Sequence, residues 1–190
     1  EVEVTVADNA DGNLTDVQTF TVNVLDVNEE PEITSYGGAS AVPFAVTENL
    51  TAVATITATD QDAGTNLTYS LSGTDQAKFD LNASTGVLTF ISAPDFENPT
   101  DVGEVNTYIV TVTVTDDGYL DVLSDSQTIT VTVENENEAP VITSDGGSSI
   151  VSLDLWENLT AVTTVTATDV DAGTNLTYSL TGTDQAKFVL

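Results

Sequence analysis

The chain has 190 residues, of which 31 are acidic, two are basic (Lys78 and Lys187) and none is histidine, so its formal net charge is -29. A surface of this sign cannot neutralise phosphates, which disfavours nucleic acid and anionic membranes as partners. The lack of cysteine excludes disulfides and zinc sites with sulfur ligands, and the lack of both histidine and cysteine excludes Ser-His and Cys-His catalysis. We therefore expect a protein that is not an enzyme and has no catalytic residues.

The hydrophobic fraction of 40% is enough to build a buried core. No apolar run approaches the ~20 residues of a membrane-spanning helix, so we expect no direct membrane insertion of this segment.

An internal repeat organises the chain. Residues 57–79 return 109 residues later as residues 166–188, with only Gln61 replaced by Val170 and Ser72 by Thr181. A period of this length is that of a whole domain. The repeat predicts that residues 1–29 are the C-terminal part of one truncated repeat, 30–138 a complete repeat, and 139–190 the N-terminal part of the next truncated repeat.

The predicted strands cover residues 20–24, 53–58, 110–115 and 129–133 in chain order. In 110–115 valine alternates with threonine, a pattern typical of a strand with one buried face. Clusters of glycine, asparagine and aspartate separate the runs and favour turns. About seven short strands in each repeat predict an all-β fold of tandem immunoglobulin-like Greek-key β-sandwiches, joined by short proline-containing linkers.

The acidic residues gather at strand ends rather than along strand faces. The pair Asp60 and Asp62 follows one strand and Asp116 closes another. In a sandwich the strand ends meet at the two poles, so we expect these carboxylates to converge where one domain joins the next. Calcium takes ~6 to 8 oxygen ligands in a flexible geometry, which such groups supply. The sequence therefore predicts bound Ca²⁺.

Five motifs recur in order along the chain, and together they resemble cadherin repeats. They are Asp-x-Asn-Glu-x-Pro (26–31), Glu-Asn (48–49), Asp-x-Asp-x-Gly-x-Asn (60–66), Asp-x-Glu (95–97) and Thr-Asp-Asp-Gly (115–118). The resemblance covers essentially the whole chain. The variant Pro-Asp-Phe-Glu-Asn-Pro, residues 94–99, looks most like the bacterial cadherin-like domains of large extracellular surface proteins and adhesins.

The resemblance implies two calcium-filled joints between successive domains. The first would bring together Asp26, Asn28, Glu29, Asp60, Asp62, Asn66 and Asp116, with Asn66 contributing its backbone carbonyl. The second would bring together Glu48, Asp95, Glu97, Asn137, Glu138, Asp169, Asp171 and Asn175.

Two departures from the family pattern affect these joints. The first joint lacks the Glu-Asn and Asp-x-Glu ligands that its leading domain would supply. The second has Asn135 where the first has Asp26, which removes one carboxylate that Glu134 or Glu136 could replace.

We interpret the chain as a calcium-binding extracellular repeat of a stiff rod or stalk in a large surface protein. Extracellular calcium modules bind with Kd on the order of 10⁻⁴ to 10⁻³ M, which favours an extracellular or cell-surface location. Its expected partners are other repeats of the same chain, with homophilic or filament contacts as a further possibility.

The main alternative is a subunit of a self-assembling extracellular filament or matrix. A carbohydrate-binding module, with Trp156, Tyr36 and Tyr119 as stacking surfaces, is the third hypothesis.

Overall fold

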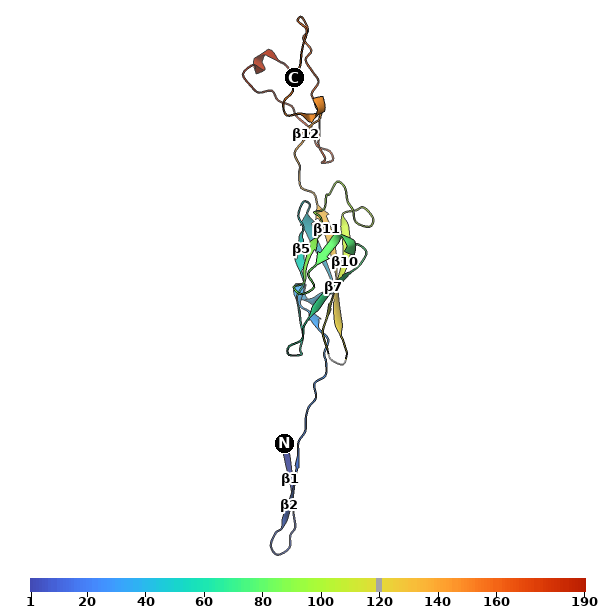
Figure 1. The fold of residues 1–190 in the computed structure, drawn as a ribbon, viewed down its shortest axis with the longest axis vertical. Helices are drawn as coiled ribbons and strands as arrows, with labels where there is room; N and C mark the ends of the chain where they lie inside the picture. The colour runs from blue at the N-terminus through green and yellow to red at the C-terminus, as the bar shows by residue number, and fades with distance from the viewer. Residues whose placement is uncertain (119–120) are drawn as a thin grey trace.

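The computed structural model describes residues 1–118 and 121–190 of the chain. Three parts follow one another along an extended axis (Figure 1): an N-terminal hairpin, a compact central sandwich and a loosely folded C-terminal part. Single extended stretches of chain connect the parts. The secondary structure of the described residues is strand and short 3-10 turns.

The central sandwich contains two main sheets. The larger has the strand order β4-β11-β10-β7 and the smaller the order β5-β9-β8. The short strands β3 and β6 pair with each other beside them. The strands are β3 (Glu32–Ile33), β4 (Ala41–Thr47), β5 (Ala52–Thr55), β6 (Ala58–Thr59), β7 (Thr68–Ser72), β8 (Phe79–Leu81), β9 (Val87–Phe90), β10 (Thr107–Thr115) and β11 (Ser124–Glu134).

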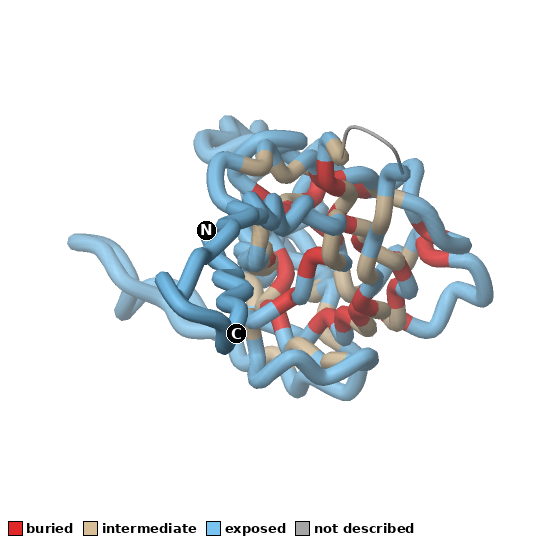
Figure 2. The backbone as a smooth tube through the Cα atoms, turned by 90° about the horizontal axis from the view of Figure 1, so that it is seen from below, coloured by how far each residue is buried: buried red, intermediate tan, exposed pale blue. Residues whose placement is uncertain are grey.

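The core lies between these two sheets, and Figure 2 shows the buried residues gathered inside the sandwich. Residues 110, 112 and 114 of β10 are fully buried valines, whereas the threonines between them face outward. Strand β11 pairs antiparallel with β10 and parallel with β4, so β11 and β10 are the two inner strands of this sheet. Because side chains alternate between the faces of a strand, the valine-threonine pattern produces one apolar and one polar face.

Aromatic rings close the end of the core nearest the second joint. The rings of Phe79 and Phe90 stack at 4.4 Å, and the ring of Tyr108 meets Phe90 edge-on at 5.1 Å. Tyr108 is 1% exposed, and its hydroxyl accepts a hydrogen bond from the N–H of Thr100 at 3.3 Å. The polar end of the ring is thereby satisfied inside an apolar environment.

The N-terminal hairpin consists of β1 (Val2–Ala7) and β2 (Thr15–Phe20), paired antiparallel from Val2 and Phe20 to Ala7 and Thr15. The sequence predicts a strand over residues 20–24, and this is wrong, because β2 ends at Phe20. Beyond that residue no β1 partner remains, and Val22 and Val24 are exposed.

The C-terminal part has little regular structure. The paired strands β12 (Val141–Ile142) and β13 (Ala167–Thr168) are its described strands. The 3-10 turns of the chain are η1 (Ser35–Gly38), η2 (Gln76–Lys78), η3 (Ser144–Gly147) and η4 (Gln185–Lys187).

The run over residues 53–58 also differs from the prediction. It divides into β5 and β6, which pair with different partners, β9 and β3. The all-β sandwich itself is confirmed. Nowhere in residues 1–118 and 121–190 is there a helix with the length and hydropathy needed to cross a bilayer.

Candidate metal centres at the two joints

Two joints connect the three parts of the chain. We define the first joint as the linker Asp26–Pro31 with the loops 60–66 and 116–118 of the sandwich. The second joint comprises Glu48, the strip 94–97, the linker 134–140 and the loop 169–175. The same backbone contact forms at both: the N–H of Glu29 donates to Asp62 Oδ2, and the N–H of Glu138 donates to Asp171 Oδ2, each at 2.9 Å.

In the first joint, Asn28 ties the linker to the end of β10. Its Nδ2 donates to Asp116 Oδ2 at 2.8 Å and to the Asp121 carbonyl at 2.9 Å. Gly118 leaves the room for this contact, because a Cβ there would overlap Asn28 Oδ1. The linker therefore rests directly on the loop that follows β10.

The aspartates after β6 form a tight turn in the same joint. The N–H of Asp62 donates to Asp60 Oδ1 at 2.8 Å, while Asp60 Oδ2 is buried and has no hydrogen-bond partner. Asp26 and Asp62 both line a hollow of about 620 Å³. The first joint thus offers carboxylate oxygens with unused acceptor capacity.

Asn66 is held by Asp117 rather than by the predicted aspartates. Its backbone N–H donates to Asp117 Oδ1 at 2.8 Å and its Nδ2 donates to Asp117 Oδ2 at 2.7 Å. These two bonds lower the pKa of Asp117. Asp117 is not among the predicted ligands, because its position after Asp116 in a turn carries no signal of this contact.

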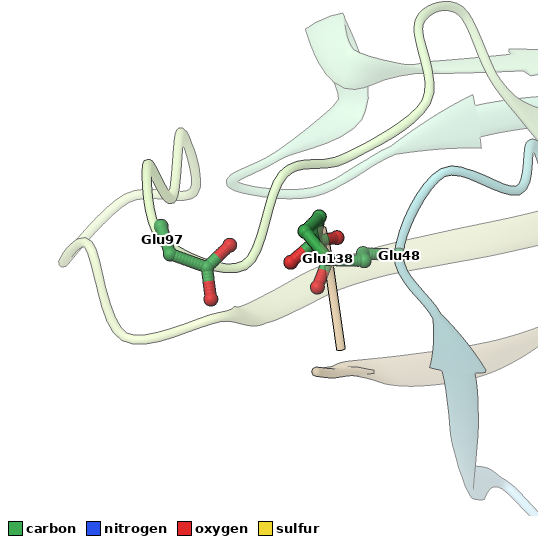
Figure 3. A group of neighbouring side chains, drawn as sticks. All are labelled: Glu48, Glu97 and Glu138. Atoms are coloured by element: carbon green, nitrogen blue, oxygen red, sulfur yellow. The ribbon is translucent and has the colours of Figure 1, made fainter. Parts of the chain in front are cut away.

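In the second joint, Glu48, Glu97 and Glu138 converge. One carboxylate oxygen from each lies within 4.8 Å of the others. Figure 3 shows Glu48 and Glu138 side by side with the Glu97 carboxylate directed toward them. Glu48 is 2% exposed, and Glu138 Oε2 is buried without a hydrogen-bond partner.

Glu48 holds in place the two chain segments that surround this cluster. Its Oε2 accepts the N–H of Phe96 at 2.8 Å and its Oε1 accepts the N–H of Glu136 at 2.9 Å. The carboxylate therefore links the strip that carries Glu97 to the linker that carries Glu138. A buried ionised carboxylate is favourable only where donors or cations compensate its lost hydration.

No basic side chain compensates the cluster. The chain has only two lysines. Lys187 pairs with Asp184 at 2.6 Å, and Lys78 ends the turn η2 of the sandwich. Burial, and after it the charges of Glu48 and Asp171, raise the pKa of Glu138, and burial likewise raises the pKa of Glu97. Three carboxylates this close repel one another unless a cation or protons lie among them.

Asp171 connects the cluster to the third part of the chain. Its Oδ1 accepts Asn135 Nδ2 at 2.8 Å, and Asp169 Oδ1 accepts the N–H of Asp171 at 3.0 Å. The hydrogen bond from Asn135, followed by that from the Glu138 N–H, lowers the pKa of Asp171. Asn135 thus contacts the joint directly, as a donor.

Three further residues predicted for the second joint make local hydrogen bonds or are exposed. Asp95 Oδ1 accepts the N–H of Asn98 at 3.0 Å within its own loop. Asn137 Nδ2 donates to the neighbouring Glu138 carbonyl at 3.1 Å, and Asn175 is exposed. By contrast, Asn49 Nδ2 donates to Glu138 Oε1 at 3.4 Å. Asn49 directly follows Glu48, which places it beside the cluster.

The aromatic residues of the carbohydrate hypothesis lie on different parts of the chain. Tyr36 meets Phe44 edge-on at 4.8 Å on the sandwich, and Trp156 is 85% exposed in the C-terminal part. Tyr119 lies outside the described residues.

The fold and the paired joints define a class of tandem β-sandwich repeats. Residues 43–134 match the Cadherin domain family model, so the chain contains a cadherin domain and is cadherin-like. Cadherin domains are non-enzymatic adhesion repeats of extracellular, cell-surface proteins, and residues 43–134 are a repeat of that kind.

The similar proteins are large. The chain is 32% identical over 169 residues to human Protocadherin Fat 1, covering 85% of this chain and 3% of that protein. It is 30% identical over 186 residues to rat Protocadherin-16, covering 95% of this chain and 5% of that protein. The chain therefore spans only a few per cent of the length of these relatives.

Solved structures have the same fold. Mouse Cadherin-23 EC22-24 matches with a TM-score of 0.58 and 26% identity over 90% of this chain and 53% of that one. Protocadherin Gamma B7 extracellular cadherin domains 1-4 match with a TM-score of 0.57 and 27% identity over 90% and 40%. Residues 94–99 predict that the chain is most similar to bacterial cadherin-like domains. This prediction is not supported, since these relatives are protocadherins and cadherins of animals.

Proposed function

We propose that the two joints bind calcium and that the bound ions stiffen the chain into a rod. The observation that carries this proposal is the second joint, where Glu48, Glu97 and Glu138 converge without a basic partner. The buried, unpartnered Glu138 Oε2 is a free oxygen ligand at that point.

The donor set fits calcium. The side chains are carboxylates and amides, the oxygen ligands that Ca²⁺ takes in numbers of ~6 to 8 without strict geometry. Magnesium would demand near-octahedral geometry and retain waters. A bound divalent cation supplies the positive charge that the cluster lacks. The chain's own residues hold the linkers in place through Glu48, Asp62 and Asp171.

We propose the following division of the chain into repeats: 1–29, 30–138 and 139–190. The two equivalent contacts of Glu29 and Glu138 with the aspartates 33 residues later support it. On this division the first joint uses Asp26, Asn28, Glu29, Asp60, Asp62, Asn66 and Asp116. The second uses Glu48, Asp95, Glu97, Asn137, Glu138, Asp169, Asp171 and Asn175.

In the parent protein, we propose a structural role as part of an extracellular stalk. Its partners are other repeats of the same chain, and homophilic contact is a proposal drawn from the protocadherin relatives. A role as a subunit of a self-assembling filament would be distinguished by sedimentation against calcium concentration, because a stalk segment stays monomeric whereas a filament subunit grows.

Isothermal titration of the 190-residue chain with calcium, and separately with magnesium, tests the binding. We expect saturable calcium binding with Kd on the order of 10⁻⁴ to 10⁻³ M and much weaker magnesium binding. Equal weak binding of both ions, without saturation, would contradict a calcium site and would leave only general attraction to an acidic surface.

A further inference from the structure

Asn106 is a buried residue whose side chain hydrogen-bonds the chain segment that carries Glu97. It is 8% exposed, it directly precedes β10, and its φ is 60°, in the left-handed region. Asparagine tolerates this region better than most residues. The burial of this amide and its uncommon backbone conformation are explained by the hydrogen bonds that Asn106 makes.

Asn106 holds two separate segments of the second joint. Its Nδ2 donates to the Phe96 carbonyl at 2.8 Å, and its own carbonyl accepts the N–H of Val133 at 3.0 Å. Phe96 directly precedes Glu97, while Val133 is near the end of β11, from which the chain continues to Glu138. One residue therefore sets the spacing between the two chain segments that carry Glu97 and Glu138.

The contacts of Asn106 complement those of Glu48. Glu48 accepts the N–H of Phe96 and the N–H of Glu136, so the peptide groups on both sides of Phe96 are fixed. The strip is held a third time where the N–H of Asn49 donates to the Pro94 carbonyl at 3.0 Å. Glu97 itself is exposed, so its position depends on these backbone bonds of the strip.

Asn106 is in turn held by a buried carboxylate. Its N–H donates to Asp101 Oδ1 at 2.9 Å, and Asp101 is 4% exposed. The same carboxylate accepts the N–H of Val105. The turn 101–106 is thereby rigid enough to place the Asn106 amide, because each of these donors would be costly to leave unpaired in the interior.

We propose that Asn106 is a positioning residue of the second joint: it presents the Glu97 carboxylate to Glu48 and Glu138 at the spacing that one divalent cation requires. This inference rests on the proposed calcium binding. Removing a group that orients a metal ligand commonly lowers the metal affinity 10- to 100-fold. The experiment must separate the effect on Glu97 from a general loss of stability.

The informative variant is Asn106→Gly, because glycine keeps the left-handed backbone and removes only the amide. Asn106→Asp is the second variant, since it keeps the size of the side chain and loses the donor to Phe96. The control is Asn82→Gly, which removes two bonds, to the N–H groups of Ser84 and Thr85, within the β8–β9 turn.

Two measurements on the whole chain are needed: amide exchange by NMR in chelator, and calcium titration followed at resonances of each joint. In chelator, Asn106→Gly should speed exchange at Phe96 and Glu97 by roughly 10-fold or more over wild type, while Asn82→Gly should not, since one buried hydrogen bond is lost. With calcium, affinity at the second joint should fall roughly 10-fold and the first joint should stay unchanged.

Different outcomes overturn different claims. The positioning role would be overturned if a folded Asn106→Gly chain had unchanged amide exchange at Phe96 and unchanged calcium affinity at the second joint. Equal loss of affinity at both joints would also overturn it, because that pattern marks general destabilisation. If wild type shows no saturable calcium response, the proposed function fails, yet exchange in chelator still reports whether Asn106 fixes the strip.

Discussion

The backbone N–H of Glu138 donates to Asp171 Oδ2 at 2.9 Å, a bond that connects the linker after the sandwich to the C-terminal part of the chain. Glu29 makes the corresponding bond to Asp62 at the same distance. Each joint therefore has its own aspartate contact with the backbone, and the two contacts can be removed independently.

Asp62→Ala and Asp171→Ala form a reciprocal test of the joints. Asp62→Ala removes the acceptor of the Glu29 N–H and one carboxylate ligand, so calcium affinity at the first joint should fall roughly 10-fold or more. The second joint should be unaffected, because Asp171 is intact. Asp171→Ala should give the opposite pattern in titrations followed by NMR at residues of each joint. Loss at the wrong joint in either variant would show that our assignment of the joints is incorrect.

Asn135→Asp should change the second joint in opposite ways with and without calcium. Asn135 Nδ2 donates to Asp171 Oδ1 at 2.8 Å, and an aspartate there would repel Asp171 instead. In chelator we expect faster amide exchange at Glu138. With calcium the added carboxylate should tighten binding roughly 10-fold, because affinity rises with ligand charge.

The reverse substitution at the first joint, Asp26→Asn, is the matched control and should weaken binding there. If Asn135→Asp leaves the affinity of the second joint unchanged, position 135 is not close enough to the ion to serve as a ligand.

Much of this arrangement follows from the sequence. The alternation over residues 110–115 predicts a half-buried strand, and β10 has that pattern because its valines lie in the core. The resemblance to cadherin repeats implies that Glu48, Glu97 and Glu138 belong to one joint, and the structure brings these three together.

The remaining features depend on contacts that no local pattern encodes. Asp117 is one of two adjacent aspartates in a turn, and only the approach of Asn66 distinguishes its role from that of Asp116. Asn106 has no periodic counterpart in this chain. The strand predicted over residues 20–24 fails for a related reason, since a β-prone run forms a strand only beside a partner.

Leu88→Ala should test whether the sandwich folds as a unit around its core. Leu88 is 0% exposed on β9, and its truncation should lower the free energy of unfolding by about 2–5 kcal/mol. Leu159→Ala is the matched control, because Leu159 is 61% exposed in the C-terminal part. Urea unfolding followed by tyrosine fluorescence in calcium measures both. Equal effects of the two variants would contradict a core centred between β9 and β10.

The pH dependence of the second joint should have opposite signs with and without calcium. Burial first, and then neighbouring carboxylates, raise the pKa of Glu97 and Glu138 above 4.5. Protons therefore compete with calcium at a higher pH than at an isolated glutamate, so affinity should fall as pH decreases toward 4.5. Without calcium, protonation relieves repulsion, so the joint should become more ordered over the same range.

Calcium titrations and amide exchange at several pH values between neutral and 4.5 measure the two trends. Glu97→Gln, which has no titrating carboxyl at that position, should flatten both. A calcium affinity that stays constant down to pH 4.5 would contradict a role for these glutamates as ligands.

Small-angle X-ray scattering of the 190-residue chain, first in calcium and then in excess chelator, tests the stiffening role most directly. We expect an extended, narrowly distributed particle in calcium. In chelator we expect a shorter mean dimension and a broader distribution, while the circular dichroism of the strands is retained because the sandwich core needs no ion. Identical scattering in both conditions would contradict the claim that calcium at the joints stiffens the chain.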